Sequence, residues 1–280
     1  MTHGMVAVVL AAGSGDRLAP LTTLLPKALC PVGNEPLVDV ALARVAGVLE
    51  AAGEPAGGEA IAVNVHHGRE ALLEHLTGRV VVSDEEQQAL GTAGGVGNLR
   101  GWIAGRDALV ANADVWLETS ADTFADGWDR ERARLLCVPA GDRRGDFGDA
   151  CYAGMCLLPW AHVSRLSADP SGLYEVLWRQ EWEAGRLDLV VVDGRFVDCG
   201  TPADYLRANL YEAARADGGS LVDPAAAIES GSSVARSVIG AGAEVHGEVT
   251  DAVVWPGAVV HPRERVLGGV RAGTLTVLVR

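Results

Sequence analysis

A glycine-rich segment near the N-terminus carries residue types that bind a polyphosphate. The apolar run Val6–Leu10 leads directly into Gly13 and Gly15, and Arg17 and Lys27 follow. Glycines let backbone N–H groups approach an anion, and the two cations add a planar fork and a point charge. The spacing fits neither a Walker loop nor a dinucleotide-binding turn, because GxxxxGK and the third glycine of GxGxxG are both missing. On the glycines alone, an ordinary strand-to-helix turn with two surface cations is an equal alternative.

Two aspartates each come directly after a predicted strand. Asp114 follows Ala108–Ala113, and Asp198 follows Arg195–Val197. Strands of an α/β sheet bind ligands at their carboxyl ends, so both side chains are candidates for one site. Mg²⁺ held by one or two carboxylates and by phosphate oxygens is the usual way to neutralise a nucleoside triphosphate. Taken singly, however, an aspartate in this position is more often a turn residue or a helix cap.

The scaffold for these residues is predicted from alternating apolar runs and helical periodicities up to about residue 210. Strands separated by helices predict an α/β fold with a mostly parallel, Rossmann-like sheet and helices on both faces. A closing helix at Thr201–Arg215 has a threonine N-cap and a proline in its first position. The other predicted elements are strands at Val6–Leu10, Ala60–Val65, Val80–Ser83, Ala108–Ala113 and Ala133–Val138, helices at Leu37–Glu50, Glu70–Leu76 and from Gly95, and a hairpin of Leu189–Val192 with Arg195–Val197.

A six-residue repeat begins after Gly218 and Gly219. Val222, Ile228 and Val234 fall six apart among small residues, and the spacing returns after a four-residue step. This pattern predicts a short, left-handed parallel β-helix of two to three coils. The alternative is a Gly/Ala-rich tail with chance valines. We therefore expect two domains, residues 1–218 and residues 219–280.

The composition narrows the class of protein. The 280-residue chain has 23 Lys and Arg against 37 Asp and Glu, a net charge of −14, which argues against nucleic acid and anionic membranes as partners. Its longest uncharged apolar stretch near the N-terminus, Met5–Ala12, is too short for a membrane span. Five scattered cysteines without a CxxC pair favour reduced thiols. We expect a cytoplasmic protein.

The whole string Leu10–Thr22, with Pro26, Lys27 and Leu29, is more specific than its glycines. It resembles the signature LAAGxGTRLxPLT…PKxLxPV of the sugar-1-phosphate nucleotidyltransferases, with Asp16 in place of the usual threonine. Three further segments are similar to family motifs in the same order. They are Leu90–Gly95 (LGTAG), Val110–Asp114 (NGD, with alanine for glycine) and Asp198–Leu206 (DVGTPEDYL).

The resemblance implies a reaction in which an NTP and a sugar 1-phosphate give an NDP-sugar and pyrophosphate. It makes residues 1–218 the catalytic domain, Arg17 and Lys27 the catalytic cations, and Asp114 and Asp198 the ligands of a Mg²⁺ cofactor. Gly154, in a segment similar to the family's NAGIY strand, and Glu175 are implied to bind the sugar, although an exposed helical glutamate is an alternative. The implied nucleotide contacts are Leu10, Ala11, Ala12, Gly13, Gly15, Gln88, Gly91 and Thr92.

Two features disagree about the substrate. The family's EKP motif, whose lysine holds the sugar phosphate, is absent between the strands around residues 138 and 152, and Arg143 or Arg144 is a candidate replacement. The short loop resembles uridylyltransferases acting on N-acetylmuramate 1-phosphate. The LGTAG segment and the β-helix tail look most like mannose-1-phosphate guanylyltransferases. We favour GTP with a mannose-like sugar or a cyclitol phosphate, and a uridylyl- or thymidylyltransferase acting on a hexose 1-phosphate is the alternative.

Two rivals come from other functional classes. A non-catalytic homologue that binds a nucleotide sugar and regulates a partner would be expected to have lost the cations or the aspartates. Hexapeptide repeats also occur in acyltransferases, and the tail contains His246 and His261. We expect that the tail packs on the catalytic domain or joins subunits, because an open β-helix end needs covering, and that the protein is a homo-oligomer. The VNVHH strand end, with Asn64, is expected to make structural hydrogen bonds or an edge contact with substrate.

Overall fold

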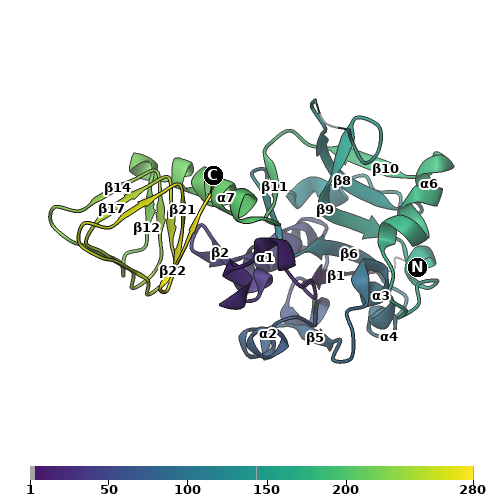
Figure 1. Cartoon of the computed structure of the whole chain (residues 1–280). Helices are drawn as coiled ribbons and strands as arrows, with labels where there is room; N and C mark the ends of the chain where they lie inside the picture. The colour runs from purple at the N-terminus through teal and green to yellow at the C-terminus, as the bar shows by residue number, and fades with distance from the viewer. Residues whose placement is uncertain (1–3, 143, 280) are drawn as a thin grey trace. The chain divides into compact units, whose positions relative to one another are not determined.

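The computed structural model describes residues 4–142 and 144–279, and the chain divides into two compact units (Figure 1). Unit 1 contains the chain up to Ser14 and Val38–Phe196, and unit 2 contains Gly15–Leu37 and Val197–Arg280. The predicted boundary between residues 218 and 219 stays a prediction. Within unit 2, helix residues such as Tyr205 contact the C-terminal strands, since Trp255 Nε1 donates to the Tyr205 hydroxyl at 2.9 Å. The assignment of catalysis to residues 1–218 stays a prediction.

Unit 1 is built on a seven-stranded sheet in the order β10-β8-β9-β6-β1-β4-β5. β1 pairs in parallel with β4 and β6, β4 with β5, and β8 with β10, while β9 runs antiparallel to β6 and β8. Strand β1, an interior strand of the sheet, is buried on both faces, which explains its unbroken apolar sequence. The strands are β1 (Met5–Leu10), β4 (Ile61–Val65), β5 (Val81–Asp84), β6 (Asp107–Asn112), β8 (Arg134–Pro139), β9 (Ala150–Leu158) and β10 (Asp188–Val191). An α/β fold with a mostly parallel central sheet is thus confirmed.

Helices α1 and α2 follow the prediction closely, α3 begins earlier than expected, and the short helices after residue 159 were not predicted. Helix α3 begins at Gly91, four residues before the expected start, although it contains several glycines. Those glycines are needed for packing, since a Cβ on Gly97 would lie 2.0 Å from the carbonyl oxygen of Ser167. The helices are α1 (Leu37–Ala51), α2 (Arg69–Leu76), α3 (Gly91–Asn98), α4 (Arg100–Ile103), α5 (Trp160–Val163) and α6 (Arg179–Glu183), with a π-helical turn at Tyr174–Trp178.

The predicted hairpin of Leu189–Val192 with Arg195–Val197 is wrong. Strand β10 pairs in parallel with β8, and the Arg195 carbonyl accepts a hydrogen bond from the N–H of Glu118 at 2.9 Å. The Asp193–Gly194 turn signal therefore marks a connection between strands with different partners. No helix in the described part of the chain is long and apolar enough to cross a membrane.

Unit 2 contains helix α7 (Pro202–Arg215), three short turns and a stack of short strands. The helix begins as predicted, because the Thr201 hydroxyl accepts the N–H of Asp204 and Pro202 occupies the first turn. The turns are Asp16–Leu18, Leu21–Thr23 and Lys27–Leu29, and they lead into the antiparallel pair β2 (Pro31–Val32) and β3 (Glu35–Pro36).

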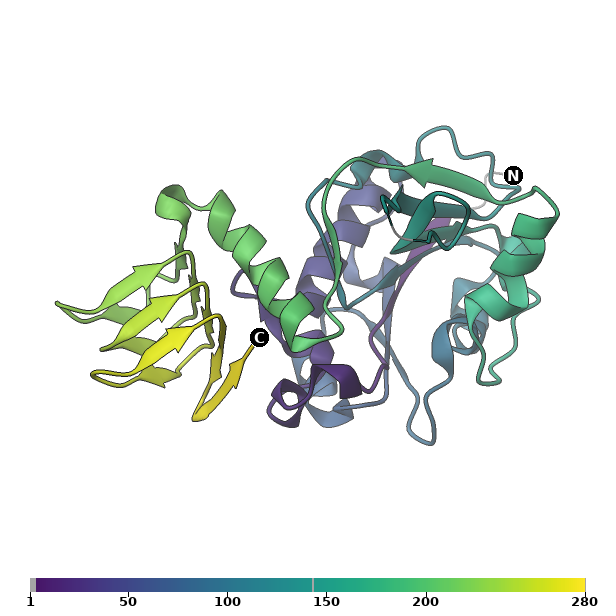
Figure 2. The ribbon, with the colours of Figure 1, turned by 45° about the horizontal axis from the view of Figure 1, so that its top comes forward.

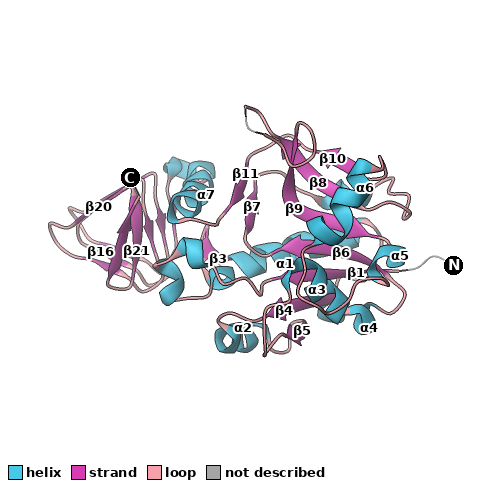
Figure 3. Ribbon diagram, turned by 45° about the vertical axis from the view of Figure 1, so that its right-hand side comes forward, coloured by secondary structure: helices cyan, strands magenta, loops and turns pink. Residues whose placement is uncertain are grey.

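The short strands of unit 2 form three parallel stacks, visible as layers in Figure 2 and as magenta arrows in Figure 3. The aliphatic residues at the predicted six-residue spacing occupy equivalent positions on the three stacks, and each pairs with the next coil, as Ile228 does with Val245. In the second and third coils, the side chains of Ile239, Val245, Val249, Val254 and Val260 fill the interior. In the first coil, Val222 and Ile228 are exposed, and Val234 is partly buried against this core. The strands therefore fit a parallel β-helix, and the left-handed winding of its coils stays a prediction. The stacks are β12 (Leu221–Val222), β15 (Val238–Ile239), β18 (Val253–Val254) and β21 (Gly269–Ala272); β13 (Ala227–Ile228), β16 (Glu244–Val245) and β19 (Val259–Val260); and β14 (Ser233–Ala235), β17 (Glu248–Thr250) and β20 (Arg265–Leu267), with β22 (Leu275–Leu278) antiparallel to β21.

Candidate active site

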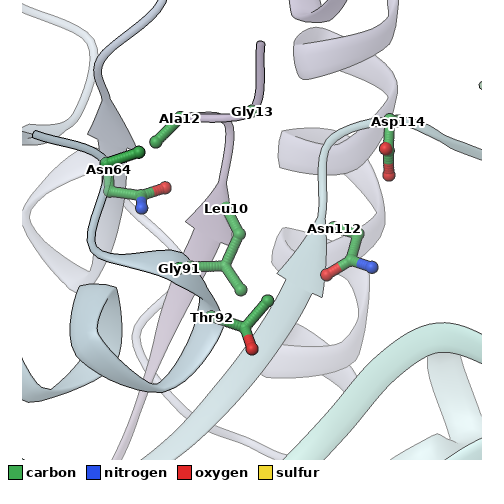
Figure 4. Close-up of a pocket in the computed structure, with 9 residues that line it drawn as sticks. Leu10, Ala12, Gly13, Asn64, Gly91, Thr92, Asn112 and Asp114 are labelled. Atoms are coloured by element: carbon green, nitrogen blue, oxygen red, sulfur yellow. The ribbon is translucent and has the colours of Figure 1, made fainter. Parts of the chain in front are cut away.

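Unit 1 has a pocket at the carboxyl ends of its central strands (Figure 4). Its volume is about 200 Å³. Figure 4 shows Leu10 and Thr92 facing Asn112 across the space, with Asp114 in the loop beyond the end of β6. The lining residues are Leu10, Ala12, Gly13, Asn64, Ala89, Gly91, Thr92, Asn112 and Asp114. Six residues proposed as nucleotide or metal contacts are thus brought together with Asn64, for which an edge contact was one of two expected roles, and Ala89 and Asn112 are additions.

The remaining nucleotide candidates of unit 1 lie beside the pocket. Ala11 is buried, and its N–H donates to Asn64 Oδ1 at 2.8 Å. Gln88 is exposed, and the neighbouring Ala89 lines the pocket in its place. Gly13 has open space where a Cβ would stand, with no atom within 4 Å. An anion can therefore approach the backbone at Gly13 closely.

The first turn of α3 forms another wall and is tied to the segment around Ser171. Gly91 has a φ of +71°, and a Cβ there would lie 2.6 Å from the Ser171 carbonyl oxygen. The N–H of Ala93 donates to that oxygen at 2.9 Å, and Thr92 Oγ1 accepts the N–H of Leu173 at 2.8 Å. Glycine at position 91 is therefore required by the packing of the loop. Thr92 is held with its hydroxyl hydrogen still available to a ligand.

A buried carboxylate that the sequence does not reveal lies behind the pocket. Glu85 is 4% exposed, and it accepts hydrogen bonds from Asn64 Nδ2 at 2.7 Å and from the N–H of Leu90 at 2.8 Å. Glu85 stands in the run DEEQQ, which has the composition of a solvated loop. Nothing in that pattern distinguishes it from its exposed neighbours.

The two histidines of the VNVHH strand end make structural hydrogen bonds. His66 Nδ1 donates to the Glu85 carbonyl oxygen at 2.6 Å, and His67 Nδ1 donates to the Ala12 carbonyl oxygen at 3.2 Å. A carbonyl oxygen only accepts, so each ring is fixed with its proton on Nδ1. Of the two expected roles, the described contacts support the structural one.

The predicted catalytic cations of unit 2 gather around one predicted metal ligand. Arg17 Nη2 lies 3.3 Å from Asp198 Oδ2, and Lys27 Nζ lies 3.4 Å from Asp198 Oδ1. The Lys27 side chain is 9% exposed, against 46% for Asp198 and 70% for Arg17. Gly200 gives the guanidinium room, because a Cβ there would lie 2.9 Å from Arg17 Nη2.

The neighbouring Gly15 is required by the fold. Its φ is +68°, and a Cβ would lie 2.9 Å from both Lys27 Cβ and Thr22 Cγ2. Its carbonyl oxygen accepts the Thr22 hydroxyl at 3.2 Å. The absence of a side chain at position 15 thus lets the loop pack directly on the residue that carries the buried ammonium.

The segment after Lys27 is anchored to α7 and to the coils. The Tyr205 hydroxyl donates to the Pro31 carbonyl oxygen and accepts from Trp255 Nε1 at 2.9 Å. Asn209 Oδ1 accepts the N–H of Gly33 at 3.1 Å. Tyr205 and Asn209 are fully buried, and burial raises the pKa of the Tyr205 hydroxyl, which stays protonated. Through Tyr205, the coils therefore help to hold in place the segment that carries Arg17 and Lys27.

Asp114 and Asp198 offer oxygen donors of the kind that Mg²⁺ prefers. Asp114 lines the pocket of unit 1, and the Asp198 carboxylate in unit 2 is half-exposed. Among the residues that the structure describes, no three His, Cys, Asp or Glu side chains gather to hold a metal ion. The donor chemistry of each aspartate fits a magnesium ligand.

The predicted sugar-binding residues have distinct surroundings in unit 1. Gly154 has a φ of +82°, and a Cβ would lie 2.7 Å from Val115 Cγ2, so packing requires glycine there. Glu175 lies in the π-helical turn and is exposed, with its carboxylate folded against Gly172. Three residues on, the Trp178 ring packs against that of Tyr152 in a tilted arrangement, with ring centroids 4.7 Å apart. Arg144 is exposed, and Arg143 lies outside the described residues.

Comparison with known proteins places this architecture in a class. A Bacillus anthracis protein described as a glucose-1-phosphate thymidylyltransferase, crystallised with sucrose, has the same fold, with a TM-score of 0.58 and 17% identity over 75% of this chain and 95% of that one. Residues 6–146 match the model of the nucleotidyl transferase family. The chain belongs to this family, and within it to the sugar-1-phosphate nucleotidyltransferases.

Curated relatives carry the same two substrate names that the motifs suggested. N-acetylmuramate α-1-phosphate uridylyltransferase of Caulobacter vibrioides is 30% identical over 72% of this chain and 95% of its own length. Mannose-1-phosphate guanylyltransferase of Mycobacterium tuberculosis is 32% identical over 51% of this chain. The chain matches 40% of the length of the latter and 63% of a mannose-1-phosphate guanylyltransferase of Arabidopsis thaliana. Similarity to the guanylyltransferases thus covers less than two thirds of those proteins.

Proposed function

We propose that this protein transfers a nucleoside monophosphate from an NTP to a sugar 1-phosphate. A phosphate oxygen of the sugar 1-phosphate attacks the α-phosphorus in line, a new P–O bond forms, and the bond from the α-phosphorus to the bridging oxygen breaks. Pyrophosphate leaves with that electron pair, so no protein nucleophile is needed. The observation that carries the proposal is the pocket of unit 1, which combines the LAAG segment, the LGTAG segment and Asp114 at one sheet edge.

The pocket is suited to the nucleoside end of the NTP. Leu10 offers an apolar face to a base, and the fixed backbone around Gly91 offers hydrogen-bonding groups. Open space at Gly13 allows a phosphate to reach the backbone. We assign nucleotide contacts to these residues, to Ala11, Ala12, Gly15 and Thr92, and to Gln88 at the exposed rim.

Arg17 and Lys27 supply positive charge for the phosphates. We propose that they stabilise the charge that builds up on the departing pyrophosphate. Mg²⁺, when bound, neutralises phosphate charge, and Asp114 and Asp198 would hold it. The Asp198 carboxylate would then be shared between the metal ion and the two cations, since Arg17 and Lys27 already contact it. Binding of a triphosphate would draw the cations to the phosphates and leave Asp198 to the ion.

We assign Gly154 and Glu175 to the sugar. The loop between β8 and β9 is short, running from Ala140 to Asp149. This supports replacement of the missing lysine by Arg144 or Arg143. Loss of sugar-phosphate affinity in the double alanine variant, at unchanged NTP affinity, would support this assignment, and unchanged sugar-phosphate affinity would remove it.

The substrate pair that we favour is GTP with a mannose-like sugar phosphate or a cyclitol phosphate. A uridylyltransferase is the second candidate, favoured by the short Ala140–Asp149 loop and by the Caulobacter relative that the chain spans almost completely. A thymidylyltransferase acting on a hexose 1-phosphate follows. A location in the cytoplasm and a homo-oligomeric state remain predictions.

The rivals from other classes receive less support. A regulatory homologue is disfavoured because Arg17, Lys27, Asp114 and Asp198 are all present. An acyltransferase would need a histidine that acts as a base. The pKa of His246 is raised by its hydrogen bonds to Glu229 and Glu244, which favour the protonated ring.

A pyrophosphate-release assay with five NTPs against several sugar 1-phosphates tests the function directly. We expect turnover only with a divalent ion present. Asp114→Asn and Asp198→Asn should each abolish pyrophosphate release while circular dichroism reports an intact fold. Activity of either variant within a few-fold of wild type would refute the metal assignment. Absence of turnover with every substrate pair would refute the function.

A further inference from the structure

A chain of buried hydrogen bonds joins two walls of the pocket. It runs from the N–H of Ala11 to Asn64 Oδ1 at 2.8 Å, from Asn64 Nδ2 to Glu85 Oε1 at 2.7 Å, and from the N–H of Leu90 to Glu85 Oε2 at 2.8 Å. Asn64 is 2% exposed and Glu85 4% exposed. Ala11 belongs to the segment after β1, and Leu90 precedes the glycine that opens α3. One side-chain pair therefore sets the separation of both segments.

We propose that Asn64 and Glu85 are positioning residues that fix the width of the nucleotide pocket and so determine NTP affinity. This inference rests on the proposed function of the same pocket. Glu85 acts through Asn64 and Leu90, because its two carboxylate oxygens are engaged by them. The pair holds the backbone on which a base and a phosphate would rest.

The placement of this pair is costly, which points to a role besides stability. A buried carboxylate loses its hydration, and an apolar pair of similar volume is often as stable. A glycine in a helix interior is also unfavourable, yet Gly95 of α3 lies directly over the pair. A Cβ on Gly95 would stand 2.7 Å from Asn64 Nδ2 and 3.1 Å from Glu85 Oε1. Both costs fall at one place, immediately behind the pocket.

Counting donors and acceptors gives a specific test. Glu85 must accept twice, so Glu85→Gln leaves one of two N–H donors facing another donor. Asn64→Asp makes two carboxylates face each other. In the double variant Asn64→Asp/Glu85→Gln, the new carboxylate accepts from Ala11 and from the new amide, whose oxygen accepts from Leu90. All three hydrogen bonds and the single negative charge are then restored with the two groups exchanged.

The experiment measures binding of GTP and of UTP by titration calorimetry, with steady-state kinetics on whichever NTP the wild-type protein uses. Each single variant should raise Kd and KM at least tenfold with a smaller change in kcat. The double variant should return Kd and KM to within about threefold of wild type. Glu86→Gln is the matched control, because it removes the same charge from a neighbouring side chain that is 75% exposed, and it should leave Kd unchanged.

Single variants with wild-type Kd would overturn the proposal, and so would a double variant no better than the worse single one. If a single variant does not fold, the double variant still tests the proposal. The proposal predicts that the double variant folds and binds the NTP with wild-type affinity, and an unfolded double variant would contradict it. Failure of the proposed function is distinguishable, because the wild-type protein would then release pyrophosphate from none of the five NTPs with any sugar 1-phosphate.

Discussion

Gly13 and Gly15, which we propose bind phosphate, should respond in opposite ways to the same added methyl group. Gly13 lines the pocket, its φ is outside the left-handed region, and a Cβ meets nothing within 4 Å. Gly15 has a φ of +68° and a Cβ that would lie 2.9 Å from two side-chain carbons. Gly13→Ala therefore tests ligand approach, and Gly15→Ala tests the fold.

The magnitudes follow from these surroundings. At Gly15, left-handed strain costs roughly 1–2 kcal/mol and overpacking roughly 1–3 kcal/mol, so Gly15→Ala should lower the free energy of unfolding by about 2–5 kcal/mol. At Gly13, the change in stability should stay within about 0.5 kcal/mol. A blocked hydrogen bond to a charged phosphate is worth about 1.5–3 kcal/mol, so Gly13→Ala should weaken NTP binding about ten- to hundredfold.

Urea unfolding gives the free energy of unfolding for each variant, and titration with the NTP substrate gives Kd. The expected pattern is a stable Gly13→Ala protein with weak binding, beside a Gly15→Ala protein with a clear loss of stability. Normal NTP affinity in Gly13→Ala would refute the assignment of the open backbone to phosphate. Equal losses of stability in both variants would refute the structural distinction between them.

Three further predictions concern unit 2. Trp255→Phe removes the donor to Tyr205, so it should lower stability by about 1 kcal/mol in urea unfolding, and a change below 0.3 kcal/mol would contradict that role. Burial raises the pKa of the Cys30 thiol to about 12, so an alkylating reagent at pH 8 should modify Cys30 only after unfolding, and rapid labelling of the native protein would be the contrary result. The hydrogen bond to Glu229 is the main reason why the pKa of His246 is raised in the folded protein. The stability that this histidine contributes is therefore complete at a pH below its unfolded-state pKa and is lost as the pH rises through its folded-state pKa. His246→Gln should flatten the dependence of melting temperature on pH between pH 6 and pH 9, and an unchanged dependence would contradict this role.

Local sequence patterns predicted those parts of the fold in which a residue's own type, apolar or helix-capping, matches the position that it occupies. The buried β1 strand, the threonine cap of α7 and the aliphatic residues of the coils all have sequence signals that match their surroundings. The hairpin failed for the opposite reason. Asp193–Gly194 favours a turn, but the partner of each flanking strand is decided by the rest of unit 1.

The site shows the same limit. The motif residues that line the pocket could be predicted, because their glycines and their order in the chain are specific. Glu85 could not, because its importance comes from burial and from two donors brought to it by distant segments. The early start of α3 was missed because glycines usually oppose helices, whereas here they admit the carbonyl groups near Ser167 and Ser171.

Unit 2 combines an early segment of the chain, Gly15–Leu37, with the last part of the chain, and this affects the order in which it can fold during synthesis. The segment with Arg17 and Lys27 leaves the ribosome early, but its partners Asp198, Tyr205 and Trp255 are made much later. Because a nascent chain folds from its N-terminal part onward, the central sheet of unit 1 can begin to form first. The contacts of Arg17 and Lys27 with Asp198 form only after residue 198 has emerged, and Trp255 follows still later. A ribosome-bound chain that stops before Asp198 would thus carry the pocket without the ion pairs that hold these two cations.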